Sequence, residues 1–204
     1  LMAIQQVNLK RLMAYSSIAQ VGYLLIGIVA LDAPSLAQSQ DAATALILHL
    51  IGYVVTNILV FTALTVFYNR TGRDDIRAMR GLAERQPFLA LVFTIGMFSL
   101  AGMPLFEGFT TKFILFQVAF SNDFLWLGAL GVTASFVSLY YYLQIIKQMY
   151  MYEPEGDDTA RFRIPIPLAA SLAVLAAGVF LLGLFPTPLF NAIDDSTRML
   201  FPGL

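Results

Sequence analysis

The sequence predicts an all-α, polytopic transmembrane helix bundle with five crossings, and three observations lead to that prediction. First, 58% of the 204 residues are hydrophobic, only 12% are charged, and the mean hydropathy is +0.74. A water-soluble domain is about half apolar and a quarter charged, so the composition argues against a soluble fold. Second, five apolar stretches are long enough to span a bilayer, which takes roughly 20 residues. Third, the cationic residues collect at alternate ends of these stretches.

Four of the apolar stretches have the length of one crossing each. They cover residues 12–31, 42–68, 124–150 and 165–190. The remaining stretch, 87–121, would be far longer than a ~30 Å hydrocarbon core at about 1.5 Å per residue. It must therefore bend, break or cross twice.

The distribution of cations decides how the long stretch crosses, because cytoplasmic loops collect Lys and Arg. If the stretch crosses once, ten of the twelve cations fall on one side: Lys10, Arg11, Arg70, Arg73, Arg77, Arg80, Arg85, Lys147, Arg161 and Arg163. Two crossings would move the last three of them to the other side. We therefore expect one broken crossing, a cytoplasmic N-terminus, an outer C-terminus, and a single membrane domain over residues 1–204.

The loop 69–86 carries five of these cations and is expected on the cytoplasmic side. The segment from Asp74 to Arg80 has helical spacing, Gly81 is a suitable C-cap, and Pro87 suits the first turn of the next helix. These features predict a short surface helix in the loop. A solvated, charged connector with no other role explains the same charges.

Helix-breaking residues and two opposite charges interrupt the third stretch. Gly102, Pro104 and Gly108 break the helical pattern, and Glu107 and Lys112 place charges in apolar sequence. Proline removes a backbone donor, and non-helical backbone at membrane depth persists only against protein or a water-filled cavity. Because discontinuous helices often mark ion or substrate paths, this break is the first candidate for a functional site.

Lys112 is the leading candidate for a protonatable group. A cation at the membrane centre costs at least a few kcal/mol and must be hydrated, paired or neutral. Its protonation is therefore expected to respond to water access and to a nearby carboxylate. Glu107 is the candidate carboxylate, although five residues is not a same-face spacing on a continuous helix. The alternative is that Lys112 snorkels to an interface.

The second stretch carries a polar stripe. His49, Tyr53 and Asn57 recur at every fourth residue with Thr56 beside them, so they are expected along one face of a helix. Histidine titrates near neutral pH and can pass protons through its two nitrogens. His49 and Tyr53 are therefore candidates for a proton pathway. A histidine that is hydrogen-bonded between packed helices explains the pattern equally well.

The other stretches contain polar residues with ordinary explanations. Lys147 is a further candidate for the proton pathway, but it lies near the inner end of its stretch, where snorkelling lysines are common. The first stretch holds a polar set that is expected to serve hydrogen-bonded helix packing: Tyr15, Ser16, Ser17, Gln20 and Tyr23.

Several classes of function find no support. The chain has no cysteine and one histidine, which excludes a disulfide framework, thiolate chemistry and a histidine-clustered metal site within it. The net charge of −1 argues against binding of nucleic acid. No Walker loop, dinucleotide fingerprint, zinc-ligand spacing or nucleophile elbow is present, so no cofactor site is expected. The start at Leu1-Met2, with no signal-peptide pattern, suggests truncation.

Residues 6–23 resemble the signature of the antiporter-like subunits of respiratory complex I. Further matches to that family are, in chain order, 77–82, Pro87, 99–104, 108–109, 112–113 and, more weakly, 138–143. Their order and spacing are similar to those of subunit N of NADH:quinone oxidoreductase. Together the matches cover most of residues 5–145.

The resemblance implies the second half of a fourteen-helix antiporter-like fold with two inverted five-helix repeats. It implies that Lys112 is the lysine of the second broken helix, on a hydrated axis of charged residues, and that His49 stands where relatives carry histidine. Asn57 falls where the larger relatives often carry lysine, which favours subunit N. Glu107 stands where a small or neutral residue is expected, so its role is not implied by the family.

The implied function is proton translocation across a bacterial inner membrane, as a translocase subunit that performs no redox chemistry itself. The implied partners are other membrane subunits of complex I, the lipid bilayer and protons, while NADH, FMN, iron–sulfur clusters and quinone belong to partner subunits. A cation/proton antiporter subunit or a membrane-bound hydrogenase subunit is the alternative within transport. A structural membrane anchor is the alternative from another class, and it predicts dry packing around Lys112.

Overall fold

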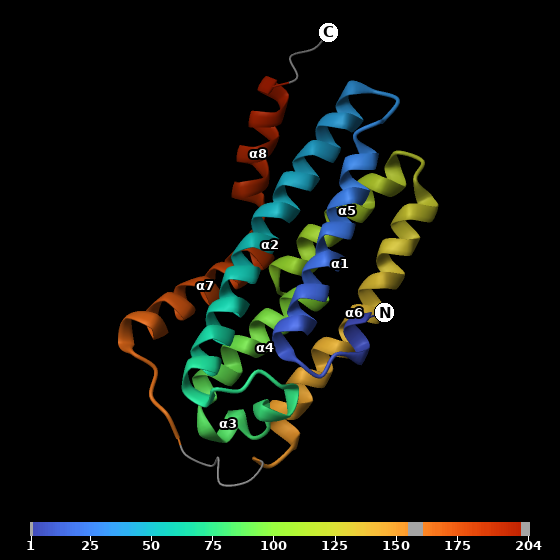
Figure 1. Cartoon of the computed structure of the whole chain (residues 1–204). Coiled ribbons are helices and arrows are strands. Elements are labelled where there is room, and N and C mark those ends of the chain that lie inside the picture. Colours follow the sequence, from blue (N-terminus) through green and yellow to red (C-terminus); the bar gives the residue numbers. More distant parts are fainter. Residues whose placement is uncertain (1, 155–160, 201–204) are drawn as a thin grey trace.

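The computed structural model describes residues 2–154 and 161–200, and the regular structure of these residues is helical apart from one isolated β-bridge between Asn8 and Asp75 (Figure 1). In chain order the helices are η1 (Met2–Gln5), α1 (Leu9–Ala30), α2 (Leu36–Thr71), η2 (Ile76–Met79), α3 (Leu82–Arg85), α4 (Pro87–Ala101), α5 (Glu107–Ser121), α6 (Leu125–Met151), α7 (Ile166–Leu184) and α8 (Thr187–Leu200).

Four helices, α1, α2, α6 and α7, are long and apolar enough to cross a membrane. The third predicted stretch is divided between α4 and α5, which have 15 residues each. The predicted all-α membrane bundle with a discontinuous third helix is therefore confirmed. Pro87 stands in the first turn of α4, as expected for a residue whose missing N–H would have no partner in the helix there.

The longest helix, α2, packs against α1, α4, α5, α7 and α8 and so forms the centre of the bundle. It extends beyond the apolar range 42–68 at both ends. Its first turn is capped by the Ser35 hydroxyl, which accepts a hydrogen bond from the backbone N–H of Gln38, and its last turn ends at Gly72 with a φ of 66°. The turns of α2 outside residues 42–68 contain polar residues, so the predicted apolar range did not include them.

The break between α4 and α5 uses two residues with positive φ. Gly102 ends α4 at a φ of 80°, and Leu105 has a φ of 79°, which is uncommon for a residue with a side chain. Gly108 was predicted as part of the break but lies in the first turn of α5. A Cβ atom there would collide with the carbonyl oxygen of Ser99, so this glycine allows α5 to pack directly against the last turn of α4.

The sequence predicted one simple helix over 165–190 for the final apolar stretch, but the structure has two helices there. The helix α7 ends at Leu184 and α8 begins at Thr187. Pro186 lies between them, where it lacks a backbone donor and disfavours helical geometry in the preceding residue. The helix α8 then lies against α2, with a hydrogen bond of 2.8 Å between the hydroxyls of Thr44 and Thr197.

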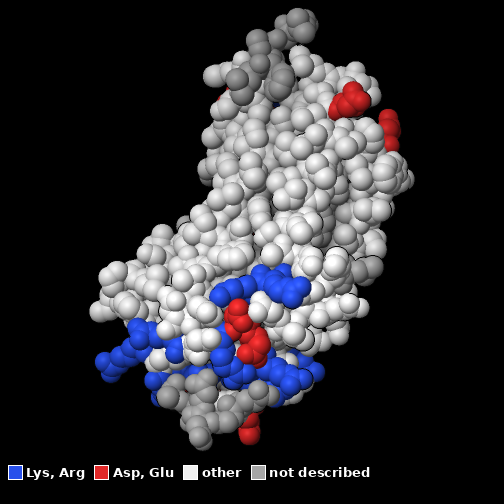
Figure 2. Space-filling view, in the orientation of Figure 1, with Lys and Arg blue, Asp and Glu red and all other residues white. Residues whose placement is uncertain are grey.

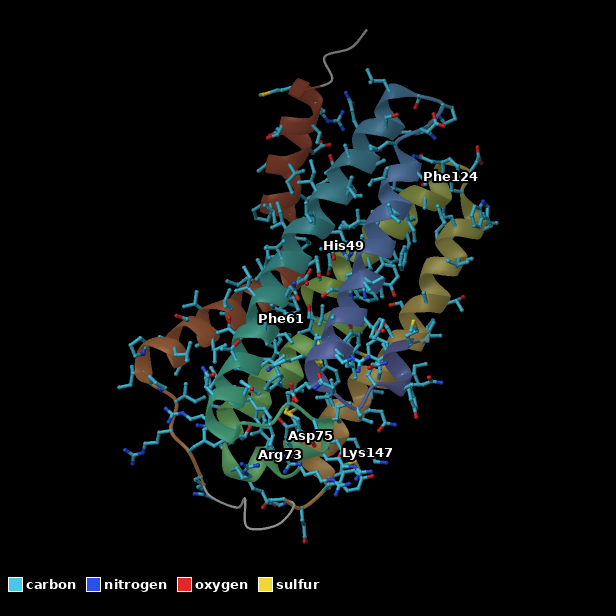
Figure 3. The ribbon with its side chains drawn as sticks, in the orientation of Figure 1. His49, Phe61, Arg73, Asp75, Phe124 and Lys147 are labelled. Carbon is cyan, nitrogen blue, oxygen red and sulfur yellow. The ribbon has the colours of Figure 1, made fainter. Side chains whose placement is uncertain are left out.

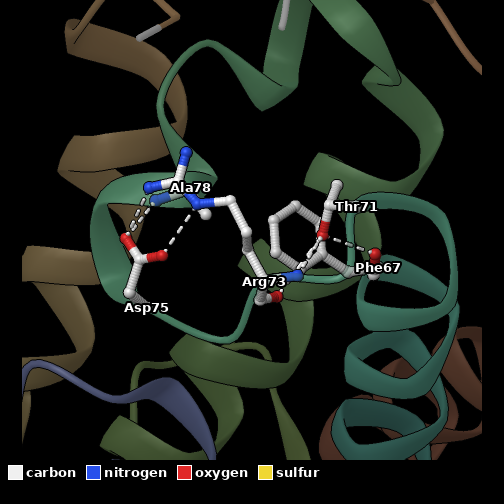
Figure 4. A network of polar contacts seen from close by, with 5 residues as sticks. All are labelled: Phe67, Thr71, Arg73, Asp75 and Ala78. Carbon is white, nitrogen blue, oxygen red and sulfur yellow. Dashed lines mark hydrogen bonds and ion pairs between the residues drawn. The ribbon is translucent and has the colours of Figure 1, made fainter.

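Lys and Arg side chains gather at one end of the bundle, around the loop between α2 and α4 (Figure 2). The short surface helix predicted over 74–80 is instead a 3₁₀ helix, η2. The Asp75 carboxylate caps it by accepting from the N–H of Ala78 at 2.9 Å, and it also binds the Arg73 guanidinium at 3.0 Å (Figure 4). Gly81 follows η2 with a φ of 64°.

Candidate functional site

The site contains the two charged side chains of α5, and both are buried. Glu107 is 2% exposed and Lys112 is 3% exposed. The Lys112 ammonium donates a hydrogen bond of 2.6 Å to the carbonyl oxygen of Leu100, in the last turn of α4, and lies 4.7 Å from the centre of the Tyr23 ring. Lys112 therefore points into the bundle between α1, α4 and α5, and it does not snorkel to a helix end.

The broken helix gives each charge a favourable backbone environment. The last turn of α4 carries carbonyl oxygens without helical partners, and the partial negative charge at this end of the helix favours the Lys112 ammonium. Glu107 is the first residue of α5, where the positive end of the helix dipole favours a carboxylate. A continuous helix would offer neither helix end, so the break itself makes room for two opposite charges.

Three hydroxyl groups surround the Glu107 carboxylate. Its Oε1 atom accepts from Thr56 at 2.5 Å and from Ser99 at 3.1 Å, and its Oε2 atom accepts from Thr111 at 3.4 Å. Gly52 leaves the space for this carboxylate, because a Cβ atom at that position would collide with Oε2. Within the described ranges, no ion pair joins Glu107 to Lys112.

His49, on α2, is buried in the middle of the bundle (Figure 3). Its Nδ1 atom is 2.9 Å from the Thr111 hydroxyl, and its ring meets the Tyr23 ring edge-on at 6.3 Å between centres. Its Nε2 atom is buried and has no hydrogen-bond partner among the described residues. The hydroxyl of Tyr23 is buried without a partner in the same way. Two buried polar atoms, one on His49 and one on Tyr23, therefore have no hydrogen-bond partner among the described residues.

The polar face of α2 differs from the predicted stripe. His49 and Thr56 point into the site with Gly52 between them, a spacing of three and four residues. Tyr53 and Asn57 are half-buried, and neither side chain makes a hydrogen bond within the part of the chain that the structure describes. The sequence predicted a polar face of α2 that includes His49. In the structure the groups of α2 that face Glu107 are spaced three and four residues apart, so they are not the predicted set at every fourth residue.

Lys147 lies apart from the other candidates. Its side chain is exposed at the charged end of the bundle, 5.6 Å from the ring of Tyr152, whereas His49 is in the interior (Figure 3). Its position near a helix end fits an interfacial lysine. The structure thus brings together His49, Glu107 and Lys112, and it leaves Lys147 outside the group.

Two residues of the polar set that was expected to serve helix packing, Gln20 and Ser16, lie in or near the site. Gln20 donates to the same carbonyl oxygen of Leu100 as Lys112, at 3.1 Å, and Ser16 is hydrogen-bonded to the hydroxyl of Tyr142 on α6. Ser99 and Thr111 were not proposed at all. Their proximity to the break was the available signal, but only the fold shows which of them reach the carboxylate.

A cavity of about 370 Å³ lies beside the helix break, between α5 and α6. Lys112 and Ser135 contribute to its wall, and the rest is apolar: Ala101, Gly102, Met103, Pro104, Phe109, Phe113, Phe116, Val132, Phe136 and Leu139. In the described part of the chain, no group of three His, Cys, Asp or Glu side chains could hold a metal ion.

Comparison with protein families gives one match over most of the chain. Residues 1–138 match the transmembrane family described as NADH:quinone oxidoreductase/Mrp antiporter. A relative from Moorella thermoacetica named NADH-quinone oxidoreductase subunit N is 41% identical over 98% of this chain. A relative of the same name from Heliobacterium modesticaldum is 36% identical, also over 98% of this chain. The chain spans 40% of the length of each of these relatives.

Solved structures show the same fold. A chain of the membrane-bound sulfane sulfur reductase, an archaeal respiratory membrane complex, superposes with a TM-score of 0.84 at 30% identity, over 97% of this chain and 38% of that one. A chain of respiratory complex I from Thermus thermophilus gives a TM-score of 0.77 at 30% identity, over 94% of this chain and 42% of that one. A chain of the Mrp complex from Dietzia gives 0.86 at 22% identity, over 98% of this chain and 44% of that one, which shows similarity of fold alone.

Proposed function

Because the chain belongs to the NADH:quinone oxidoreductase/Mrp antiporter transmembrane family, we propose that it is part of a proton-translocating, antiporter-like subunit of a respiratory NADH:quinone oxidoreductase. Lys112 is its central protonatable group, with Glu107 and His49 as neighbours that exchange protons or respond to its charge. The sequence motifs that resemble subunit N and the relatives that carry that name support this assignment.

One observation carries the proposal: a lysine ammonium lies buried at the break of a discontinuous helix, bonded to a backbone carbonyl of the last helical turn instead of a carboxylate. A lysine held by a strong ion pair would keep its proton, because removing one partner of a buried pair leaves an uncompensated charge. Lys112 contacts one carbonyl oxygen and an aromatic ring, so no paired carboxylate opposes the loss of its proton. Changes in water access can therefore change its protonation.

The remaining assignments are part of the same proposal. The cationic end of the bundle faces the cytoplasm and the C-terminus lies outside, because the positive-inside bias favours that orientation. The protein works in a bacterial inner membrane with other membrane subunits of complex I. Electron transfer among NADH, FMN, iron–sulfur clusters and quinone takes place in partner subunits, and the coupling to this chain is conformational or electrostatic. Tyr53 and Lys147 stay predicted members of the proton pathway.

The test is the Lys112→Ala variant in the full-length subunit of the assembled complex, reconstituted in vesicles. We expect assembly to persist and proton pumping to be lost or strongly reduced, since no other buried lysine can replace this group in the described ranges. Lys10→Ala is the matched control, because Lys10 is a half-exposed lysine in an ion pair with Asp74 at the charged end. Pumping at the control's rate by Lys112→Ala would refute the proposal.

A subunit of a cation/proton antiporter is the second candidate, because the fold is shared with a chain of an Mrp complex. The genes that flank the full-length reading frame separate the two, since only a complex I operon also encodes flavin and quinone-site subunits. The same observation separates a membrane-bound hydrogenase. A purely structural anchor predicts dry packing at Lys112, and ordered water that reaches its ammonium from His49 would refute that alternative.

A further inference from the structure

Thr111 has one hydroxyl proton but lies between two polar groups. Its Oγ1 atom is 2.9 Å from Nδ1 of His49 and 3.4 Å from Oε2 of Glu107. All three side chains are at most 2% exposed, so bulk water does not compete for these contacts. A hydroxyl can donate to one of two neighbours and accept from the other. The hydroxyl of Thr111 must therefore point toward the carboxylate or toward the imidazole.

The direction of this hydroxyl follows from the charge of Glu107. When the carboxylate is ionised, Thr111 donates to Oε2, so Nδ1 of His49 must carry the proton and Nε2 is an acceptor. When Glu107 carries a proton on Oε2, Thr111 donates to Nδ1, and the histidine proton lies on Nε2. The tautomer of His49 and the charge of Glu107 are thus linked through one hydroxyl group.

A separate observation identifies where a proton could enter. Nε2 of His49 is buried and has no partner among the described residues, although buried polar atoms are normally hydrogen-bonded. In one tautomer this atom accepts a hydrogen bond and in the other it donates one. A water molecule can serve as the partner in both cases, because it can donate or accept, whereas a fixed donor or a fixed acceptor on the protein would favour a single tautomer.

We propose that Thr111 is a relay residue through which His49 loads and unloads a proton on Glu107. A proton binds to Nε2 of His49, the proton on Nδ1 passes to Oγ1 of Thr111, and the former hydroxyl proton of Thr111 passes to Oε2 of Glu107. One proton is taken up, one carboxylate is neutralised, and His49 ends as the neutral tautomer with its proton on Nε2. Unloading is the reverse sequence. The inference rests on the proposed function, in which Lys112 changes its charge.

The arrangement around Glu107 explains why such a path is useful. Thr56 and Ser99 both donate to Oε1, so Oε2 is the oxygen left to accept a proton. Lys112 is the nearest buried cation but makes no ion pair with Glu107 in the described structure. When Lys112 loses its proton, an ionised carboxylate would remain alone in the interior, which is costly. Protonation of Glu107 through Thr111 removes that cost.

The experiment compares three variants of the full-length subunit in the assembled complex. Thr111→Val keeps the shape of the side chain but removes the hydroxyl, and we expect proton pumping to fall by about a hundredfold or more, the scale typical of a lost proton-transfer group. Thr111→Ser keeps a hydroxyl and is expected to restore pumping to near the original rate. Thr110→Val is the matched control, because the hydroxyl of Thr110 bonds to the carbonyl oxygen of Gly183 at 2.9 Å, away from the relay.

An infrared difference spectrum of the working complex supplies a readout that a packing role would not change. The original protein is expected to show a carboxylic acid band that appears on turnover and is absent in Glu107→Gln. Thr111→Val is expected to delay that band, and Thr111→Ser to restore its rate. This measurement on the original protein and on Glu107→Gln keeps the proposal open to refutation even if Thr111→Val does not assemble.

Two results would overturn the relay. The first is that every carboxylic acid band in the spectrum of the original protein is also present in Glu107→Gln, since Glu107 would then not change its charge during turnover. The other is a Thr111→Val complex that pumps at the rate of Thr110→Val. If either result is found while Lys112→Ala abolishes pumping in the same assay, the relay is refuted but the proposed function is not. If Lys112→Ala also pumps normally, the proposed function fails with it.

Discussion

Replacing Gly52 with alanine tests the architecture of the buried carboxylate. In the structure, a Cβ atom at position 52 would collide with Oε2 of Glu107 and would lie 2.8 Å from Cδ of the same side chain. The backbone of α2 and the first turn of α5 are both held in helices, so the carboxylate is the part that must move. Moving it breaks at least one of its hydrogen bonds, such as the 2.5 Å contact from Thr56.

The size of the effect follows from that geometry. A hydrogen bond to a charged group contributes about 1.5–3 kcal/mol, and overpacking a filled interior costs about 1–3 kcal/mol. These figures describe the same displacement, so we expect Gly52→Ala to destabilise the subunit by about 1.5–3 kcal/mol. Gly22→Ala is the matched control, because nothing lies within 4 Å of a Cβ atom there. Alanine in a helix is more favourable than glycine by about 1 kcal/mol, so this control should be neutral or stabilising.

The assay is heat-induced loss of the subunit from the purified complex, followed by size-exclusion chromatography, with proton pumping measured in parallel. Gly52→Ala should lower the midpoint temperature relative to Gly22→Ala and should reduce pumping. Combining Gly52→Ala with Glu107→Asp should recover part of the stability, because the shorter carboxylate leaves space for the new methyl group. The reasoning is refuted if Gly52→Ala matches Gly22→Ala in both stability and pumping.

Two further predictions concern the helix break and the charged loop. Gly108→Ala would place a Cβ atom against the carbonyl oxygen of Ser99, so the backbone of α4 or α5 must shift. We expect the amount of assembled subunit on a membrane immunoblot to fall well below that of Gly22→Ala. Equal amounts would contradict the close packing of α5 on α4. Asp75→Ala removes the cap of η2, including the 2.9 Å hydrogen bond from the N–H of Ala78. We expect it to lower the stability of the subunit in thermal unfolding by about 1 kcal/mol and to leave proton pumping unchanged. Loss of pumping with intact assembly would give the loop a role that the structure does not indicate.

The sequence predicted the class of fold and the position of the break. Apolar stretches report on bilayer crossings because the cost of placing polar groups in lipid is large and adds up along the chain. Gly102 and Pro104 marked the interruption because each acts on its own backbone, whatever surrounds it. Lys112 was selected for the same reason, since a charge in an apolar segment is unusual by itself. Its burial is confirmed, and its role in proton transfer stays a prediction.

The predictions that failed depended on neighbours. The last stretch looked simple because Pro186 lies in apolar sequence, yet one missing donor was enough to separate α7 from α8. The polar stripe of α2 was read at intervals of four residues, but the face toward α5 also uses an interval of three, so Thr56 and not Asn57 reaches the carboxylate. Gly108 was predicted as a helix breaker, and in the structure it lies in the first turn of α5, where it contacts the preceding helix.

The sequence by itself determined that the chain crosses the membrane several times, that one crossing is broken, and that a lysine and a glutamate lie at the break. These properties are set by the free energy of each residue in lipid and by local backbone geometry, so they can be read in chain order. Only the tertiary structure decided that Thr111 lies between His49 and Glu107, and that Lys112 binds a carbonyl instead of the nearby carboxylate. A hydrogen bond depends on a few tenths of an ångström between side chains from different helices, and packing alone sets that distance.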